Sequence, residues 1–125
     1  MAQTILVVED EVFVRLDMAD YLGRFGYDVF EASNASEAMS LIRSRADIDV
    51  VFTDVRMPGC SMDGMALAQW IIENRPEIAV IITSGDTAKD AAMNSLCGAH
   101  VFSKPYEPAQ VTAKIREIFV TRKLN

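Results

Sequence analysis

The sequence predicts an α/β protein in which helices cover both faces of a five-stranded parallel sheet. Five short runs rich in apolar residues alternate along the 125 residues with stretches of helical period. Several of these runs are continuously apolar, which is typical of strands buried on both faces of a parallel sheet. Because crossovers between parallel strands are right-handed, we expect a doubly wound sheet. The runs lie at residues 5–8, 29–32, 50–53, 78–83 and 101–103.

The stretches between and after these runs predict five helices. Asn34 or Ser33 suits the N-cap of the second helix, Pro76 and Gly98 end the third and fourth, and Pro108 suits the first turn of the fifth. The apolar positions that can share one face are Val12, Leu16, Ala19, Leu22 and Phe25 in the first helix, Ala35, Ala38, Leu41 and Ile42 in the second, Leu67, Ala68, Ile71 and Ile72 in the third, Ala88, Ala91, Ala92 and Leu96 in the fourth, and Val111, Ile115, Ile118 and Phe119 in the fifth.

Composition and charge narrow the class of protein. Half of the chain is apolar and 24% is charged, an ordinary mix for a globular domain. Its length suits one domain, so we expect residues 1–125 to form a single domain. Twelve basic and eighteen acidic residues give a net charge of −6, which disfavours direct binding to nucleic acid or to an anionic membrane.

The cysteines and the N-terminus predict a cytoplasmic location. Cys60 and Cys97 are far apart and form no C-x-x-C pattern, so two free thiols in a reducing compartment are favoured over a disulfide or a metal pair. The N-terminus has no basic start of the kind that a signal peptide needs. No apolar stretch approaches the length that spans a membrane.

Charged and hydroxyl side chains follow four of the predicted strands. Glu9 and Asp10 come after the first strand and Asp54 after the third. Ser84 follows the fourth strand and Lys104 the fifth. In a doubly wound parallel sheet the carboxyl ends of the strands meet at one edge, where such folds place their ligands. We therefore expect these five side chains to lie together.

The chemistry of this set points to phosphate. Three carboxylates held together repel one another, and a hard divalent cation with a nearby lysine would keep them ionised. Mg²⁺ retains several waters in such sites, which leaves positions for a phosphoryl oxygen. A carboxylate can attack phosphorus, while the Ser84 hydroxyl and the Lys104 ammonium each take an oxygen of the transferred group and Gly85 permits its close approach. These residues predict an acidic, metal-dependent phosphate site, and this reasoning leaves open which acid is attacked.

Five motifs in order, VVEDE, TDVRMPG, MDG, ITSG and SKPY, resemble the receiver domain of two-component response regulators. The resemblance covers essentially the whole chain. It implies a flavodoxin-like fold with strand order 2-1-3-4-5 and five helices. It also implies phosphate transfer from a histidine kinase or a histidine phosphotransfer protein, slow self-catalysed dephosphorylation, and output through contacts with an unknown downstream protein at the face of the fourth helix, fifth strand and fifth helix.

The resemblance assigns roles to individual residues. Asp54 matches the phosphoacceptor and also a metal ligand. Asp10 matches the direct ligand of Mg²⁺, Glu9 an acid that acts through water, and the backbone carbonyl of Arg56 a further ligand. Ser84 matches the hydroxyl that follows the phosphoryl group.

Lys104 matches the lysine that pairs with the phosphoryl group, and Pro105 follows a peptide bond that is often cis in the family. Arg56 and Asp86 occupy places that flank the phosphoryl group and tune its hydrolysis. A cationic side chain at Arg56 is expected to change the lifetime of the phosphate.

The chain departs from the family pattern at three places. Glu9 stands where aspartate is commoner, and its longer side chain can still reach a metal-bound water. The segment before the MDG motif carries two extra residues, around Cys60 and Ser61, beside the predicted site. Val101 stands where many receivers carry the aromatic half of the switch, so we expect the signal to leave through another surface.

Two other functions fit parts of the sequence. The first is a small phosphatase that works through an aspartyl phosphate; Arg56 argues against it, because many such enzymes have a general-acid aspartate two residues after the nucleophile. The second is a degenerate receiver that serves as a protein-binding scaffold, against which the intact acids, Ser84 and Lys104 argue. Taken singly, Asp10 could merely cap a helix and Asp54 could be an ordinary turn residue.

Overall fold

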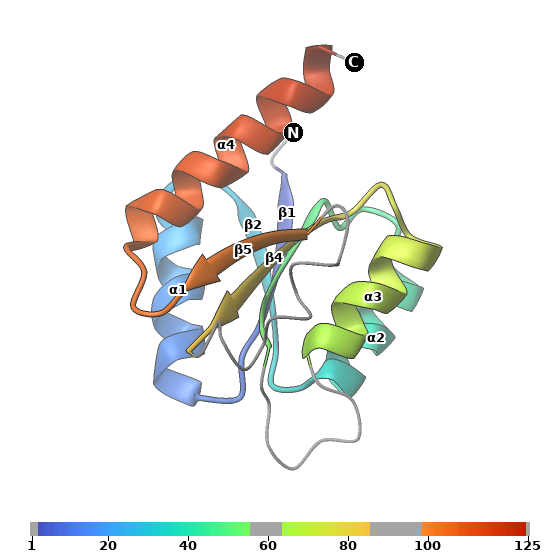
Figure 1. Ribbon diagram of the computed structural model, residues 1–125, viewed down its shortest axis with the longest axis horizontal. Helices are drawn as coiled ribbons and strands as arrows, with labels where there is room; N and C mark the ends of the chain where they lie inside the picture. The colour runs from blue at the N-terminus through green and yellow to red at the C-terminus, as the bar shows by residue number, and fades with distance from the viewer. Residues whose placement is uncertain (1–2, 56–63, 86–98, 125) are drawn as a thin grey trace.

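The computed structural model describes residues 3–55, 64–85 and 99–124 (Figure 1). Five strands form one parallel sheet in the order β2-β1-β3-β4-β5. This confirms the predicted sheet and its strand order. The strands are β1 (Thr4–Val8), β2 (Asp28–Ala32), β3 (Val50–Asp54), β4 (Ala79–Ser84) and β5 (Ala99–Ser103).

Four helices cover the two faces of the sheet within the described ranges. Figure 1 shows α1 and α4 on one face and α2 and α3 on the other. The fourth predicted helix, over residues 88–96, lies outside the described residues, so α4 is the fifth predicted helix. The helices are α1 (Val12–Arg24), α2 (Ala35–Ser44), α3 (Gly64–Asn74) and α4 (Pro108–Leu124).

Successive side chains of each central strand point to opposite faces of the sheet and pack into two separate apolar cores. In β1, Leu6 and Val8 pack with α2 and α3, whereas Ile5 and Val7 pack with α1 and α4. All four side chains are fully buried, as the continuous apolar runs predict. A central strand held from both faces gives a rigid base for whatever follows its carboxyl end.

The N-terminus of α2 has the expected cap. The Asn34 side chain accepts a hydrogen bond of 2.8 Å from the backbone N–H of Glu37. The Glu37 carboxylate in turn accepts from the backbone N–H of Ser33 at 2.9 Å and from its hydroxyl at 2.8 Å. These two bonds hold the pKa of Glu37 below its ordinary value. Asn34 is therefore the N-cap, and Ser33 supports it from the preceding position.

The predicted face of α1 is wrong in part. Val12, Leu16 and Phe25 are 49%, 47% and 44% exposed, whereas Met18 and Leu22 are the buried residues of this helix. The face of α1 that packs on the sheet is thus rotated about the helix axis relative to the face that apolar spacing predicts. Apolar spacing did not predict this shift, because the residue of the first turn that points toward the sheet is charged: it is Arg15, whose side chain is 17% exposed.

Among the residues that the structure describes, no helix is long and apolar enough to span a lipid bilayer.

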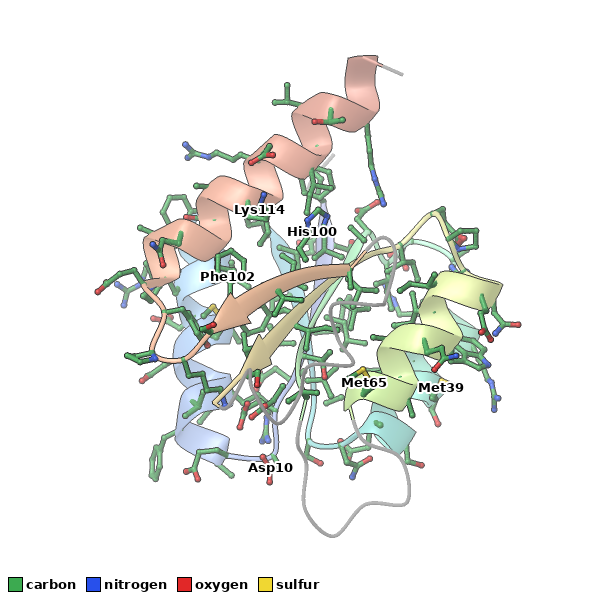
Figure 2. The ribbon with its side chains drawn as sticks, viewed as in Figure 1. Asp10, Met39, Met65, His100, Phe102 and Lys114 are labelled. Atoms are coloured by element: carbon green, nitrogen blue, oxygen red, sulfur yellow. The ribbon has the colours of Figure 1, made fainter. Side chains whose placement is uncertain are left out.

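The stability of the fold should depend on His100. This half-buried side chain lies on β5 under α4, close to Lys114 (Figure 2). Burial lowers its pKa below the ordinary value of 6.5; Lys114 and Arg122 lower it further and Glu117 opposes them. The unfolded chain therefore binds the proton more readily, and the free energy of unfolding should fall as the pH drops through 6.5.

Urea unfolding at pH 7.5 and pH 5.5 measures this effect, with His100→Gln as the comparison. The variant should lose less stability than the wild type over this interval. Equal losses in the two proteins would contradict the assigned role of His100.

Candidate functional site

The strand order places the ends of β1 and β3 side by side at one edge of the sheet. Val8 pairs with Thr53, so Glu9 and Asp54, one residue further along each chain segment, lie side by side at this edge. The backbone N–H of Glu9 donates to the carbonyl of Ala32 at 3.0 Å, which extends the pairing of β1 with β2 beyond its last residue. The two acids thus project from backbone that is fixed by the sheet.

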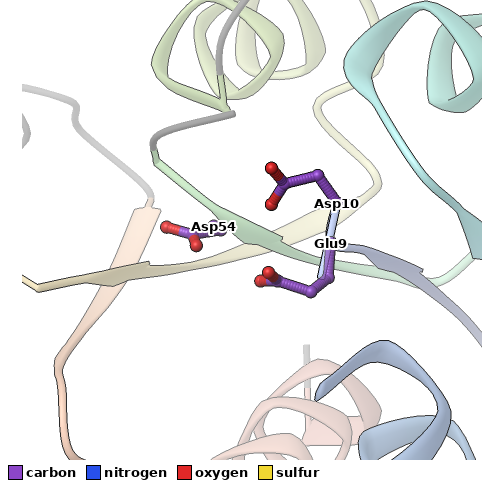
Figure 3. Close-up of side chains that lie close together, drawn as sticks. All are labelled: Glu9, Asp10 and Asp54. Carbon is purple, nitrogen blue, oxygen red and sulfur yellow. The ribbon is translucent and has the colours of Figure 1, made fainter. Parts of the chain in front are cut away.

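Glu9, Asp10 and Asp54 form a cluster of carboxylates at this edge (Figure 3). One carboxylate oxygen from each residue lies within 4.8 Å of the others. Glu9 and Asp54 are 6% and 7% exposed, whereas Asp10 is open to solvent. Oxygen ligands at this spacing, with one open side, could hold a metal ion that keeps water.

The electrostatics of the cluster favour a cation. Burial raises the pKa of Glu9 to about 7, and the charge of Asp54 adds to the rise. A hydrogen bond from the backbone N–H of Glu11, at 3.2 Å, and the charge of Lys104 oppose it. Since burial and the charge of Asp54 both oppose ionisation of Glu9, a divalent cation beside these carboxylates would favour its charged form.

The side chain of Lys104 places a positive charge beside these carboxylates. Its Nζ donates to Oδ2 of Asp54 at 2.6 Å. Its backbone N–H donates to the carbonyl of Ser84 at 2.7 Å, which ties the end of β5 to the end of β4. The Lys104–Pro105 peptide bond is cis, as the resemblance implies. Lys104 is therefore paired with Asp54, the carboxylate that the sequence predicts to be the phosphoacceptor.

Ser84 closes β4 at the same edge. The side chain is fully buried, and the residue pairs with Ser103 of β5 while its neighbour Thr83 pairs with Asp54. The structure thus brings the ends of β1, β3, β4 and β5 to one place, as predicted. Arg56 and Asp86 lie outside the described residues, as do the extra residues around Cys60 and Ser61.

Val101, at the place of the family's aromatic residue, is half-buried against the core beneath α2 and α3. The adjacent Phe102 packs into the other core, beneath α1 and α4. Tyr106 is an aromatic residue close enough to the acids to feel their charge, and its ring meets that of Phe52 edge-on with 5.8 Å between the ring centroids. Burial, with the charges of Glu9 and Asp54, raises the pKa of Tyr106 to about 12, so the negative field of the cluster reaches this side chain.

Gly64 is a supporting residue whose role sequence reasoning did not predict. It begins α3 directly against the end of β3, where its N–H donates to the carbonyl of Val55 at 3.0 Å. A Cβ at this position would lie 1.8 Å from the backbone oxygen of Asp54. The MDG motif contains this glycine, and the physical reason for it is the close approach of α3 to the backbone that carries Asp54.

Comparison with known proteins gives a consistent result. The response regulator receiver domain family matches residues 5–116. The Aerobic respiration control protein ArcA of Escherichia coli K12 is 33% identical over 122 residues, which are 97% of this chain and 50% of that protein. The Sensor kinase CckA of Brucella abortus is 34% identical over 119 residues, which are 92% of this chain and 12% of that protein.

A solved structure agrees with these matches. The crystal structure of a response regulator receiver domain protein from Clostridium thermocellum superposes with a TM-score of 0.87 at 30% identity and covers 98% of each chain. The present chain spans about half the length of the first curated relatives that it matches.

The substitution Gly64→Ala should destabilise the protein by about 1–3 kcal/mol, because the added methyl group meets backbone that cannot swing aside. Urea unfolding measures the change in the free energy of unfolding. Gly23→Ala is the matched control, since within the described residues a Cβ at Gly23 meets nothing within 4 Å. The control should be neutral or stabilising by up to about 1 kcal/mol. A Gly64→Ala variant as stable as the wild type would contradict the assigned close approach.

Proposed function

The chain belongs to the response regulator receiver domain family, and from this premise we propose that it takes a phosphoryl group onto Asp54 in the presence of Mg²⁺. The donor is a histidine kinase or a histidine phosphotransfer protein. The observation that carries the proposal is the convergence of Glu9, Asp10 and Asp54 with Lys104 at the carboxyl edge of the sheet.

The chemistry follows from the positions of these groups. A carboxylate oxygen of Asp54 attacks phosphorus and forms an acyl phosphate, while the bond from phosphorus to the donor's imidazole nitrogen breaks and the imidazole leaves. Bound Mg²⁺ supplies positive charge that draws the acids and the phosphoryl oxygens together. The Lys104 ammonium, paired with Asp54 in this structure, would pair with one phosphoryl oxygen instead, and the Ser84 hydroxyl would donate a hydrogen bond to another.

Glu9 and Asp10 provide the remaining protein charge at the metal. In this proposal Asp10 and Asp54 bind Mg²⁺ directly, Glu9 acts through water, and the backbone carbonyl of Arg56 completes the protein's share of the ligands. The exposed Asp10 side chain leaves the site open to solvent on one side, which suits a metal that keeps several waters.

The same proposal covers hydrolysis and output. Dephosphorylation is slow and self-catalysed; rapid turnover of the aspartyl-phosphatase kind is disfavoured, because many such enzymes carry a general-acid aspartate where this chain has Arg56. Arg56 and Asp86 set the lifetime of the phosphate. Phosphorylation biases a two-state equilibrium that alters contacts with a downstream protein. Residues 1–125 act as one receiver domain, in the cytoplasm, where isolated cysteines stay reduced.

The relatives show how varied this output is. One is named as a respiration control protein, another as a transcriptional regulatory protein and a third as a sensor kinase. The receiver is therefore shared among chains with different outputs, and the downstream partner of this chain has to be sought by experiment.

The first turn of α1 offers a surface for the phosphate donor. Val12, Phe13 and Leu16 are 49%, 76% and 47% exposed, and α1 begins two residues after Asp10. Exposed apolar side chains grouped on one helix are typical of interaction sites. We assign this surface to the donor because a donor histidine must approach Asp54 from the same edge.

Asp54→Asn should abolish labelling. The protein is incubated with Mg²⁺ and acetyl phosphate, and intact mass is measured. The wild type should gain one phosphoryl group, and Asp17→Asn, an exposed acid on α1, should behave like the wild type. Labelling of the Asp54→Asn variant, or many turnovers of a small phosphate ester by the wild type, would contradict the proposed role.

The test uses a phosphorylated histidine kinase that labels the wild type. Phe13→Ser should lower the rate of phosphoryl transfer from this kinase by about tenfold, the loss expected for one central apolar contact. Its labelling by acetyl phosphate should stay unchanged, because the small donor does not need the surface. Phe25→Ser, at the residue that follows the far end of α1 and 44% exposed, is the control and should leave both rates unchanged. Equal rates with the kinase for all three proteins would exclude this docking surface.

A further inference from the structure

Arg15 occupies an unusual place in α1. Arg15, Met18 and Leu22 follow one another at helical spacing on the side that faces the sheet, and Met18 and Leu22 are buried. The Arg15 side chain is only 17% exposed, less than its apolar neighbours Val14 and Leu16. A guanidinium turned inward in this way needs partners, and the identity of those partners indicates its role.

The guanidinium joins three elements at the edge of the candidate site. Its Nη1 donates to the backbone carbonyl of Glu9 at 3.0 Å, just past the end of β1. Its Nε donates to the Oε1 atom of Glu31 on β2 at 3.2 Å. Glu31 pairs with Val7 across the two strands, so α1, β1 and β2 meet at one side chain. The planar fork of arginine can make both bonds at once.

The bond to Glu9 bears directly on Asp10. The carbonyl of Glu9 belongs to the rigid peptide unit that joins Glu9 to Asp10, so fixing this oxygen fixes the plane from which Asp10 departs. The N–H of Glu9 is already held by Ala32 at 3.0 Å, and Glu9 Oε1 accepts from the N–H of Glu11. With Arg15 in place, the backbone between the two acids is held on both sides.

We propose that Arg15 is a positioning residue for the divalent cation: it sets metal affinity by orienting the peptide from which Glu9 and Asp10 project, through its bonds to the Glu9 carbonyl and to Glu31. The inference rests on the proposed function in one respect, that these acids bind Mg²⁺. Outer partners of metal ligands commonly change affinity by about 10–100-fold when they are removed.

An effect of Arg15 through its charge and an effect through positioning predict opposite changes in Mg²⁺ affinity when the residue is removed. A cation near the site repels Mg²⁺, so removing Arg15 would tighten binding if charge were its only effect. If Arg15 orients the ligands, its removal weakens binding. The sign of the change in affinity therefore separates the two roles.

The test is calorimetric titration of the unphosphorylated protein with Mg²⁺ alone. Arg15→Gln should raise the dissociation constant by about tenfold. Arg15→Lys keeps the charge but cannot hold both partners at once, so it should fall with the glutamine variant rather than with the wild type. Arg24→Gln removes an exposed arginine of the same helix that pairs with Asp20 at 2.8 Å, and it should bind Mg²⁺ as the wild type does.

Glu31→Gln gives a second, milder test, because it leaves Arg15 and its bond to the Glu9 carbonyl in place. Its dissociation constant should rise less than that of Arg15→Gln. Thermal unfolding without Mg²⁺ identifies a variant that has merely lost its fold. If Arg15→Gln is unfolded, the Arg15→Lys titration decides, because the lysine keeps the positive charge and weaker binding then reports lost positioning.

Unchanged or tighter binding in folded Arg15→Gln, or a lysine variant that binds like the wild type, would overturn the inference alone. A wild type that does not bind Mg²⁺ would overturn both the inference and the proposed function.

Discussion

The burial of neighbouring carboxylates is the constraint on which the arrangement of this site depends. Glu9, Asp10 and Asp54 are held within a few ångströms at one sheet edge, and two of them are almost fully buried. The pKa of Glu9, raised to about 7, records the cost of this burial. Lys104 offsets part of the repulsion through its bond to Asp54, and a divalent cation would offset the rest.

The fold supplies the rigidity that holds such a cluster together. β1 and β3 are central strands, buried on both faces by two apolar cores, and their ends cannot move apart without disrupting the sheet. Short contacts then carry this rigidity to the acids themselves. Gly64 brings α3 against the backbone of Asp54, and Arg15 ties the carbonyl of Glu9 to β2. The positions of Glu9 and Asp54 are thus fixed by the strand ends that carry them.

The strands and the edge that carries the site could be predicted from the sequence, because a strand buried on both faces appears as a continuous apolar run. Continuous Ile and Val runs located the strands, and the polar residues that end them, Asp54 and Ser84 among them, located the site edge. The strand order needed the family resemblance, since local patterns do not say which strands are neighbours.

Contacts between distant elements could not be predicted in the same way. Apolar spacing put Leu16 on the expected face of α1, but the structure turns Arg15 inward, because the Glu31 carboxylate on β2 and the backbone carbonyl of Glu9 accept its hydrogen bonds there. The close approach at Gly64 likewise depends on where α3 meets β3. Both features arise from tertiary packing, which has no local signal in the chain.

The most direct test of this account is urea unfolding of the wild type at increasing Mg²⁺ concentration, beside Asp10→Asn. If the acids converge as described, Mg²⁺ stabilises the native wild type, by about 2.7 kcal/mol at one hundred times the dissociation constant. Without Mg²⁺ the variant is the more stable protein, because one repelling charge is gone, and it gains less from the metal. A wild type whose stability does not change with Mg²⁺, and that is more stable than Asp10→Asn in its absence, would contradict the central claim.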